Sequence, residues 1–182
     1  MVSKWKTLSS KTLIHNKLFD LKEEKVLSPE NNEFPVWVME SPAWINIIPI
    51  TKDREVIMIK QYRFGNKEIT LEIPGGMSEQ GEDPMQAAIR EMLEETGYTS
   101  TNVLEIGSAS PNPALMSNQV ISYLALDVEF IKKQNLDTME DIEVVKINLD
   151  DIPLLIDDKT IDHSLVISAF YFYERFKKNN YL

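Results

Sequence analysis

The chain has 182 residues, and 43% of them are hydrophobic, which is enough to bury the core of one domain. Its 19 Lys and Arg residues against 29 Asp and Glu residues give a formal net charge of −10. This excess of acid disfavours a broad electrostatic hold on nucleic acid, so we expect no nucleic-acid partner. An anionic ligand would need bound cations or a few well-placed basic side chains.

The composition also limits metal chemistry and location. The chain has no cysteine, and its two histidines, His15 and His163, lie near opposite ends. Thiolate sites and paired-histidine zinc sites are therefore excluded. No apolar run approaches membrane-spanning length, and residues 1–16 are basic without the continuous apolar segment of a secretory signal. We expect a cytoplasmic protein without a membrane partner.

Strand and helix patterns follow one another along the chain without a repeat or a low-complexity linker. Strands are predicted at residues 11–19, 21–28, 34–40, 43–51, 54–62, 118–128 and 142–148, and helices at 84–96, 149–157 and 162–178. Four aromatic residues of the last helix are expected to pack in the core: Tyr171, Phe172, Tyr173 and Phe176. The predicted fold class is therefore α/β, with a mixed sheet between helices.

The helix at residues 84–96 carries clear start and stop signals. Asp83 can accept hydrogen bonds at the N-cap, Pro84 suits the first helical position, and Gln86 completes a capping box. Gly97 can adopt the left-handed conformation that ends a helix. At 100° per residue the helix has one apolar stripe, which we expect to face the core. The stripe contains Met85, Ala88, Ile89 and Met92.

The opposite arc of this helix brings together three carboxylates, Glu91, Glu94 and Glu95, with the small Ala87 beside them. The spacing gives them no Lys or Arg at a neutralising position. Carboxylates three or four residues apart repel by about 0.7 kcal/mol per pair in water and by about 3 kcal/mol at an effective dielectric of 20. An exposed acidic surface would tolerate this repulsion. A divalent cation would reverse it, and three converging carboxylates suit Mg²⁺ or Mn²⁺.

The stretch from Gly76 to Tyr98 also has the form of a family signature. Gly76, five residues, Glu82, seven residues and then "REMLEETGY" resemble the signature of the Nudix hydrolases at every specified position. The flanking stretches "IKQYRFGNKEITLEIPGG", "SPNPALMSNQ" and "MEDIEVVKI" resemble the subgroup that cleaves ADP-ribose and other nucleoside diphosphate sugars. The resemblance covers nearly the whole chain. It implies the Nudix fold, a mixed sheet between helices (α/β/α), with an N-terminal strand extension.

The resemblance also implies roles for residues of the signature. In this family the glutamates bind divalent metal across the substrate diphosphate. Four residues are implied as ligands of Mg²⁺ or Mn²⁺: Gly75 through its carbonyl, Glu91, Glu94 and Glu95. Arg90 is implied to orient or pair with a signature carboxylate, and Glu82 to support the ligands.

The general base is implied to lie on a loop after the signature. Glu140 in "DTMEDIEV" stands at the corresponding place of the subgroup, so we take it as the first candidate. Some Nudix enzymes draw the base from the signature itself, which keeps Glu95 and Glu94 open. Asp141 and Glu143 of the same loop also stay open.

Four residues are candidates for substrate binding: Arg63, Glu72, Trp44 and Pro111. Arg63 in "QYRFG" lies where the subgroup supplies a phosphate-contacting arginine, and the alternative is a surface salt bridge with Glu72. Trp44 or Trp37 could stack on a nucleotide base, although packing within a strand is the commoner role. Pro111 fits the loop that follows the signature in this subgroup.

The implied reaction is metal-dependent hydrolysis of a nucleoside diphosphate sugar to a nucleoside monophosphate and a sugar phosphate. The pair Asn112-Pro113 departs from the Ser-Pro-Gly pattern of ADP-ribose pyrophosphatases, so ADP-ribose and GDP-mannose are both open substrates. The alternatives are a pyrophosphohydrolase of nucleoside triphosphates or capped RNA, and a non-catalytic Nudix-like ligand sensor. By analogy, residues 1–42 are expected to form a strand arm that pairs two copies into a homodimer, and residues 43–182 the hydrolase domain.

Overall fold

The computed structural model describes residues 1–180, and the chain divides into two compact units. The first unit comprises Met1–Pro42 and Ser110–Gln119, and the second comprises Ala43–Ala109 and the chain from Val120 onward. The first unit therefore contains a later segment of the chain in addition to the N-terminal residues. Within the described residues, no helix is long and apolar enough to cross a membrane.

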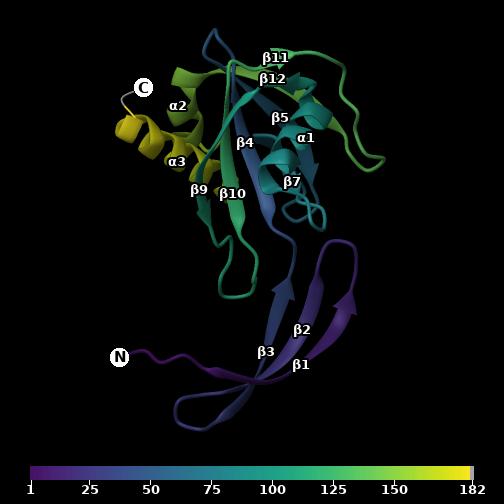
Figure 1. The fold of residues 1–182 in the computed structure, drawn as a ribbon, viewed down its shortest axis with the longest axis vertical. Coiled ribbons are helices and arrows are strands. Elements are labelled where there is room, and N and C mark those ends of the chain that lie inside the picture. Colours follow the sequence, from purple (N-terminus) through teal and green to yellow (C-terminus); the bar gives the residue numbers. More distant parts are fainter. Residues whose placement is uncertain (181–182) are drawn as a thin grey trace. The chain divides into compact units, whose positions relative to one another are not determined.

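The first unit is built on an antiparallel sheet of three strands (Figure 1). In order, they are β1 (Lys6–His15), β2 (Asp20–Leu27) and β3 (Glu33–Glu40). The segment 110–119 joins this sheet at β3, because the Met39 N–H donates to the Leu115 carbonyl at 2.8 Å. The predicted N-terminal strand extension is thus confirmed as a small sheet.

The strand predicted at residues 11–19 is present as part of β1, but its predicted end was wrong, because the chain reverses after His15. β1 ends at His15, and the Asn16 side-chain oxygen accepts hydrogen bonds from the N–H groups of Leu18 at 2.8 Å and Phe19 at 3.1 Å. An asparagine side chain that bonds the backbone two residues on favours a turn over a continuing strand.

The second unit contains a mixed sheet with helices on both faces (Figure 1). The main strand order is β12 (Ile142–Asn148), β5 (Glu55–Arg63), β4 (Trp44–Ile50), β10 (Val120–Leu126) and β9 (Asn102–Ala109). β6 (Glu68–Glu72) pairs with β5, β7 (Gly75–Met77) pairs with β4, and β8 (Tyr98–Thr99) pairs with β11 (Glu129–Phe130). β4 and β10 run parallel. The helical elements are α1 (Pro84–Thr96), η1 (Leu149–Asp151), α2 (Ile152–Asp157) and α3 (Ser164–Asn180).

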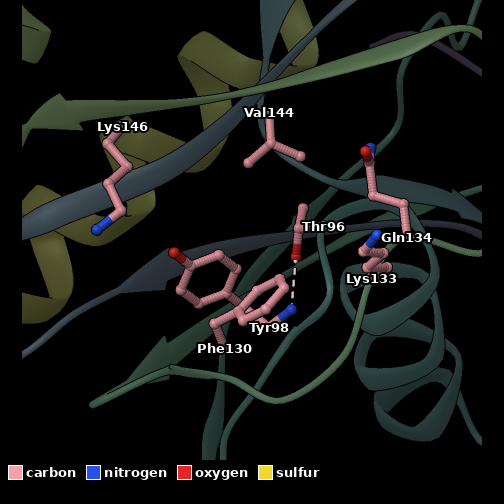
Figure 2. A pocket seen from close by; sticks show the side chains of 7 residues that line it. All are labelled: Thr96, Tyr98, Phe130, Lys133, Gln134, Val144 and Lys146. Carbon is pink, nitrogen blue, oxygen red and sulfur yellow. Dashed lines mark hydrogen bonds between the residues drawn. The ribbon is translucent and has the colours of Figure 1, made fainter.

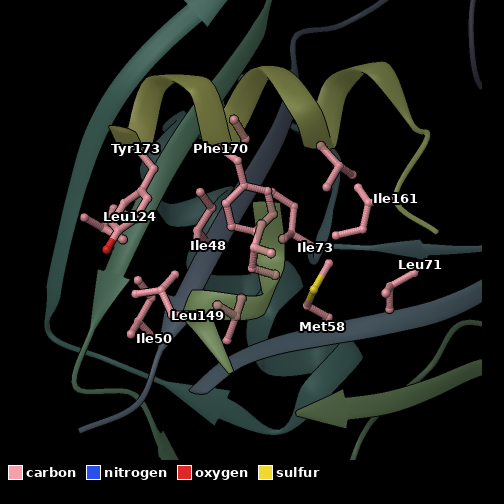
Figure 3. Close-up of a cluster of buried hydrophobic side chains, with 14 residues drawn as sticks. Ile48, Ile50, Met58, Leu71, Ile73, Leu124, Leu149, Ile161, Phe170 and Tyr173 are labelled. Carbon is pink, nitrogen blue, oxygen red and sulfur yellow. The ribbon is translucent and has the colours of Figure 1, made fainter. Parts of the chain in front are cut away.

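The central strand β4 shows why the sheet carries a layer on each face. Ile48 and Ile50 belong to the apolar cluster under α3, which Figure 3 shows, whereas Ile45 and Ile47 belong to the cluster under α1. Successive strand residues face opposite sides, so a nearly continuous apolar run marks a strand that is buried on both faces. The arrangement confirms the predicted α/β/α class.

The aromatic residues of α3 divide between core and surface. Tyr173 is buried, Phe176 packs against the same cluster, and the Phe172 ring lies against Gly107 of β9. The prediction was wrong for Tyr171, which is 62% exposed. Helical geometry explains the difference, because a helix on a sheet has one inward face and consecutive residues are 100° apart.

Candidate active site

The helix α1 positions the acidic residues of the signature, and its ends are capped as predicted. Asp83 accepts hydrogen bonds from the N–H groups of Met85 at 3.0 Å and Gln86 at 3.1 Å. Gly97 has a φ of 76° and donates its N–H to the Leu93 carbonyl at 3.0 Å. These caps satisfy backbone groups that the helix cannot satisfy itself, and they confirm the predicted bounds.

The inner face of α1 is wider than the predicted apolar stripe. Ala88 and Met92 are fully buried, as expected, but Ala87 is buried in the same cluster although the sequence analysis placed it on the acidic arc. Glu95 is only 3% exposed, so this acidic residue faces the interior. The arc is therefore partly buried, and an exposed acidic surface does not describe it.

Two glycines of β7 allow close approaches, Gly75 to β4 and Gly76 to α1. A Cβ on Gly75 would lie 2.4 Å from the Ile45 carbonyl oxygen, and a Cβ on Gly76 would lie 2.6 Å from Oε1 of Glu91. The Gly75 N–H donates to Oε2 of Glu95 at 3.0 Å. The missing side chain of Gly76 leaves room for the Glu91 carboxylate, and the hydrogen bond from Gly75 holds the Glu95 carboxylate at the same strand.

Arg90 binds three of the carboxylates around it. Its Nε and Nη2 donate to Glu82 at 2.9 and 3.1 Å, and its Nη1 donates to Glu91 at 2.9 Å and Glu94 at 3.0 Å. The prediction that no base neutralises the acidic arc was therefore wrong. A guanidinium can bind several carboxylates at once because its donors lie in one plane.

The carboxylates of Glu95 and Glu91 are electrostatically strained. Burial raises the pKa of Glu95 well above its ordinary value, and the charges of Glu91 and Glu140 raise it further, against the hydrogen bond from Gly75. The pKa of Glu91 is also raised, mainly by burial. The charge and hydrogen bond of Arg90 lower it, but the neighbouring carboxylates Glu94 and Glu140 raise it again. In both groups the ionised form is disfavoured, so each binds a proton more readily than an exposed glutamate does.

Glu140 lies close enough to act on both of these carboxylates. It sits in the loop between β11 and β12, and its charge contributes to the raised pKa values of Glu91 and Glu95. Its own carboxylate accepts a hydrogen bond from the Asp137 N–H at 2.9 Å. Of the other candidates, Glu143 lies in β12 and pairs with Lys60 at 3.6 Å, and Asp141 is exposed.

Arg63 and Glu72 form a partly buried ion pair. Nε and Nη2 of Arg63 donate to the two carboxylate oxygens of Glu72 at 2.7 and 2.6 Å, and the Thr70 hydroxyl donates to the same carboxylate at 2.5 Å. Burial tends to raise the pKa of Glu72, but the hydrogen bonds and charge of Arg63 outweigh it and lower the pKa. The predicted alternative of a salt bridge is present, with the Glu72 side chain only 4% exposed.

The remaining predicted residues are spread between the units. Trp44 is half-buried at the start of β4, opposite Met77 in the strand register, while Trp37 and Pro111 belong to the first unit. The structure therefore groups Gly75, Glu91, Glu94, Glu95, Arg90 and Glu140 in one place on the second unit.

A pocket of about 650 Å³, which the sequence did not predict, lies beyond the C-terminal end of α1 (Figure 2). It is lined by Thr96, Tyr98, Phe130, Lys133, Gln134, Val144 and Lys146. The rings of Tyr98 and Phe130 meet edge to face, with centroids 5.5 Å apart. These residues come from three separate segments, around residues 96–98, 130–134 and 144–146, so no single sequence motif could have revealed the pocket.

The donor set at the glutamates fits a hard divalent cation. The donors are carboxylate oxygens and a backbone carbonyl, which Mg²⁺ and Mn²⁺ prefer. Among residues 1–180, no group of three acidic or histidine side chains is arranged to hold a metal ion. Glu91 and Glu94 instead accept hydrogen bonds from Arg90, and Glu95 accepts one from the Gly75 N–H. Because Gly76 has no side chain, the Glu91 carboxylate can lie close to the strand.

A model of the NUDIX domain matches residues 41–170. This match covers most of the chain, and the chain therefore belongs to the Nudix family of hydrolases. ADP-ribose pyrophosphatase of Bacillus subtilis (strain 168) is 29% identical over 157 residues, which are 86% of this chain and 85% of the relative. Methanol dehydrogenase activator of Bacillus methanolicus is 29% identical over 170 residues, which are 91% of each chain.

The fold is shared with a solved structure. The crystal structure of an ADP compounds hydrolase superposes with a TM-score of 0.85, at 22% sequence identity, over 99% of this chain and 97% of that one. This agreement confirms the Nudix fold.

Proposed function

We propose that the chain hydrolyses the diphosphate of a nucleoside diphosphate sugar with Mg²⁺ or Mn²⁺, releasing a nucleoside monophosphate and a sugar phosphate. One observation carries the proposal. Glu91 and Glu95 lie against the glycine turn of β7, and Glu140 is near enough to raise the pKa of both. Neighbouring carboxylates with perturbed pKa values are typical of sites that bind a cation or move a proton.

The signature residues would hold the cation. Its ligands would be the Gly75 carbonyl and the carboxylates of Glu91, Glu94 and Glu95. When bound, a divalent cation neutralises charge on the diphosphate oxygens, which otherwise repel an attacking water. Arg90 donates hydrogen bonds to Glu91 and Glu94, and we propose that its role is to orient these two carboxylates.

Glu140 would take the proton from the attacking water. Its carboxylate accepts one hydrogen bond, from Asp137, so further lone pairs stay available to a water molecule. Its charge already acts on Glu95 and Glu91, which supports a place beside the diphosphate. Glu95 itself is more strongly constrained, because it is buried and bonded to Gly75.

Arg63 would contact a phosphate of the substrate. Glu72 holds its guanidinium through Nε and Nη2, and the Arg63 side chain is still 42% exposed. The charges of Arg63 and Glu95 influence each other, which supports a position near the carboxylates. Glu72 would therefore act through Arg63, and Trp44 stays a candidate for stacking on the nucleotide base.

ADP-ribose is the first substrate to test, because similarity to the Bacillus subtilis pyrophosphatase extends over most of both chains. GDP-mannose is the second. The relative from Bacillus methanolicus has a different name, but the complete signature of this chain favours hydrolysis over a purely non-catalytic role. Nucleoside triphosphates and capped RNA stay as alternatives, and the net charge of −10 disfavours a long RNA.

The test is a panel of these compounds with Mg²⁺ or Mn²⁺ and identification of the products. We expect a nucleoside monophosphate and a sugar phosphate, abolished by a chelator and restored by metal. Glu140→Gln should lower kcat about a hundredfold or more while substrate and metal affinity stay within a few-fold. Release of pyrophosphate from a triphosphate, with no cleavage of sugar nucleotides, would contradict the proposal.

We also propose that the first unit pairs two copies of the chain. Large apolar side chains exposed on this unit include Trp5, Leu13, Ile14, Phe34 and Trp37. An extensive exposed apolar surface is typical of an interface. Light scattering of the full chain should give the mass of a dimer, and a monomer at micromolar concentration would contradict this. Cytoplasmic location stays a prediction.

A further inference from the structure

The loop between β11 and β12, residues 131–141, lies across the C-terminal end of α1. The last carbonyls of a helix have no partner inside the helix. The loop supplies two partners: the Asn135 N–H donates to the Glu94 carbonyl at 2.8 Å, and Nε2 of Gln134 donates to the Glu95 carbonyl at 2.6 Å. The loop is therefore docked on the backbone of two signature glutamates.

Gly97 allows the loop to come this close. The Ile131 N–H donates to the Gly97 carbonyl at 2.9 Å, and a Cβ on Gly97 would lie 1.9 Å from the Lys132 carbonyl oxygen. No side chain fits at such a distance. The glycine that ends the helix thus also leaves room for the loop that carries Glu140.

The Gln134 side chain links the beginning of this loop to its end. Besides the Glu95 carbonyl, its Nε2 donates to the carbonyl of Ile142, the first residue of β12, at 3.1 Å. One amide group therefore joins the end of α1, the beginning of the loop and the beginning of the strand. Glu140 lies two residues before Ile142, inside the segment that this amide closes.

Apolar packing holds this part of the loop only weakly. Residues 131–135 are exposed, and the pocket described above opens beside Gln134 (Figure 2). Where few apolar contacts fix a segment, its hydrogen bonds determine its position. The two bonds from Gln134 are side-chain bonds, so a substitution can remove them without breaking the backbone.

We propose that Gln134 is a positioning residue for the reaction: its amide fixes the loop so that the Glu140 carboxylate is held beside Glu91 and Glu95. The inference rests on the proposed function, in which Glu140 is the base. Gln134 touches neither substrate nor metal in this account. Gln134 instead controls the distance between the Glu140 carboxylate and the reacting water. A displacement of the base by about 1 Å can lower the rate by up to about a hundredfold.

Two substitutions separate the donor role of Gln134 from its size. Gln134→Met has a similar length and no donor, and Gln134→Glu places a carboxylate against two carbonyl oxygens. Both should lower kcat about tenfold or more, with KM and Mn²⁺ affinity within about threefold of wild type. Gln134→Lys keeps donors and should retain most of kcat. Lys133→Gln, in which the neighbouring exposed side chain changes, is the matched control and should behave as wild type.

A double-mutant cycle with Glu140→Gln tests whether Gln134 acts through Glu140. In the Glu140→Gln background, Gln134→Met should change kcat by less than about twofold, because the base is already lost. An equal loss in both backgrounds would overturn the inference, as would a normal kcat for Gln134→Met beside a slow Glu140→Gln. A normal kcat for Glu140→Gln alone would overturn the proposed base and this inference together. Each failure is therefore distinguishable.

Discussion

Two buried glutamates of the second unit, Glu72 and Glu95, have opposite surroundings. Each is only 3% exposed. Glu72 receives two hydrogen bonds from Arg63 and one from Thr70, and its pKa is lowered. Glu95 receives one from the Gly75 N–H and lies near Glu91 and other carboxylates, and its pKa is raised by burial and then by like charge.

The difference shows that burial alone does not identify a functional carboxylate. When a buried carboxylate has a well-placed arginine, the arginine compensates its charge, and the pair can serve a structural role. A buried carboxylate among other carboxylates destabilises the fold unless a cation or a proton compensates it. The contrast supports our proposals that Glu72 holds Arg63 in place and that Glu95 and its neighbouring carboxylates bind a cation.

The largest expected effect is on activity. Glu95→Gln keeps the size of the side chain and removes its charge, so it should remove about 4 kcal/mol of transition-state stabilisation, or roughly a thousandfold in kcat/KM. Steady-state kinetics on the substrate identified by the panel would measure this. An activity within tenfold of wild type would remove Glu95 from the group of metal ligands.

The next largest effect is on stability, and it is expected when Glu72 loses its arginine and becomes a buried carboxylate without a compensating charge, as Glu95 is. Arg63→Met leaves Glu72 buried without its partner, which should destabilise the fold by about 3 kcal/mol and raise the pKa of Glu72. Urea unfolding near neutral pH measures the loss.

The double variant Arg63→Met with Glu72→Gln is the control for this effect. It removes the uncompensated charge and should recover more than half of the lost stability. If the single and double variants were equally unstable, the loss would come from packing of the arginine side chain, and the electrostatic comparison would fail at Glu72.

The sequence predicted the elements that depend on local signals. α1 has the expected bounds because Asp83 and Gly97 cap it through neighbouring backbone groups. The apolar strands β4 and β5 were also predicted, because residues buried on both faces leave a continuous apolar run. β9 was missed: its sequence contains several polar residues, and it is held by pairing with β10 and by the Phe172 ring against Gly107.

The site was predictable only as far as spacing and resemblance reach. The spacing placed three glutamates on one arc, but it did not reveal that Glu95 is buried, because its hydrogen-bond partner Gly75 lies 20 residues earlier. The resemblance implied that Arg90 pairs with a signature carboxylate, and Arg90 donates to both Glu91 and Glu94. Contacts between distant segments depend on the tertiary fold, which no helical period encodes.

A smaller effect concerns the stability of the metal-free protein. A raised folded-state pKa means that ionised Glu95 costs stability: the cost is absent below the ordinary pKa of 4.5 and appears as the pH rises through the folded value. Glu95→Gln should therefore stabilise the metal-free protein near pH 8, on the order of 1 kcal/mol or about 2–4 °C in Tm, and this gain should vanish toward pH 4.

Glu72→Gln should show the opposite sign. The lowered pKa of Glu72 means that its contribution is present above 4.5 and is lost as the pH falls through the folded value. The variant should therefore be less stable than wild type near pH 8, and the two proteins should converge in acid. Thermal unfolding of both variants between pH 4 and pH 8 is the measurement, and equal signs for the two glutamates would contradict the comparison.

The most direct test of the central claim is Mn²⁺ binding without substrate. If the buried charge of Glu95 exists to hold a cation, Mn²⁺ at about 100 times its dissociation constant should stabilise the wild type by about 2.7 kcal/mol. Glu95→Gln should show little of this shift at the same concentration, whereas Glu72→Gln should keep most of it. A thermal titration that gave the same Mn²⁺ shift for wild type and Glu95→Gln, or none for the wild type, would contradict the account.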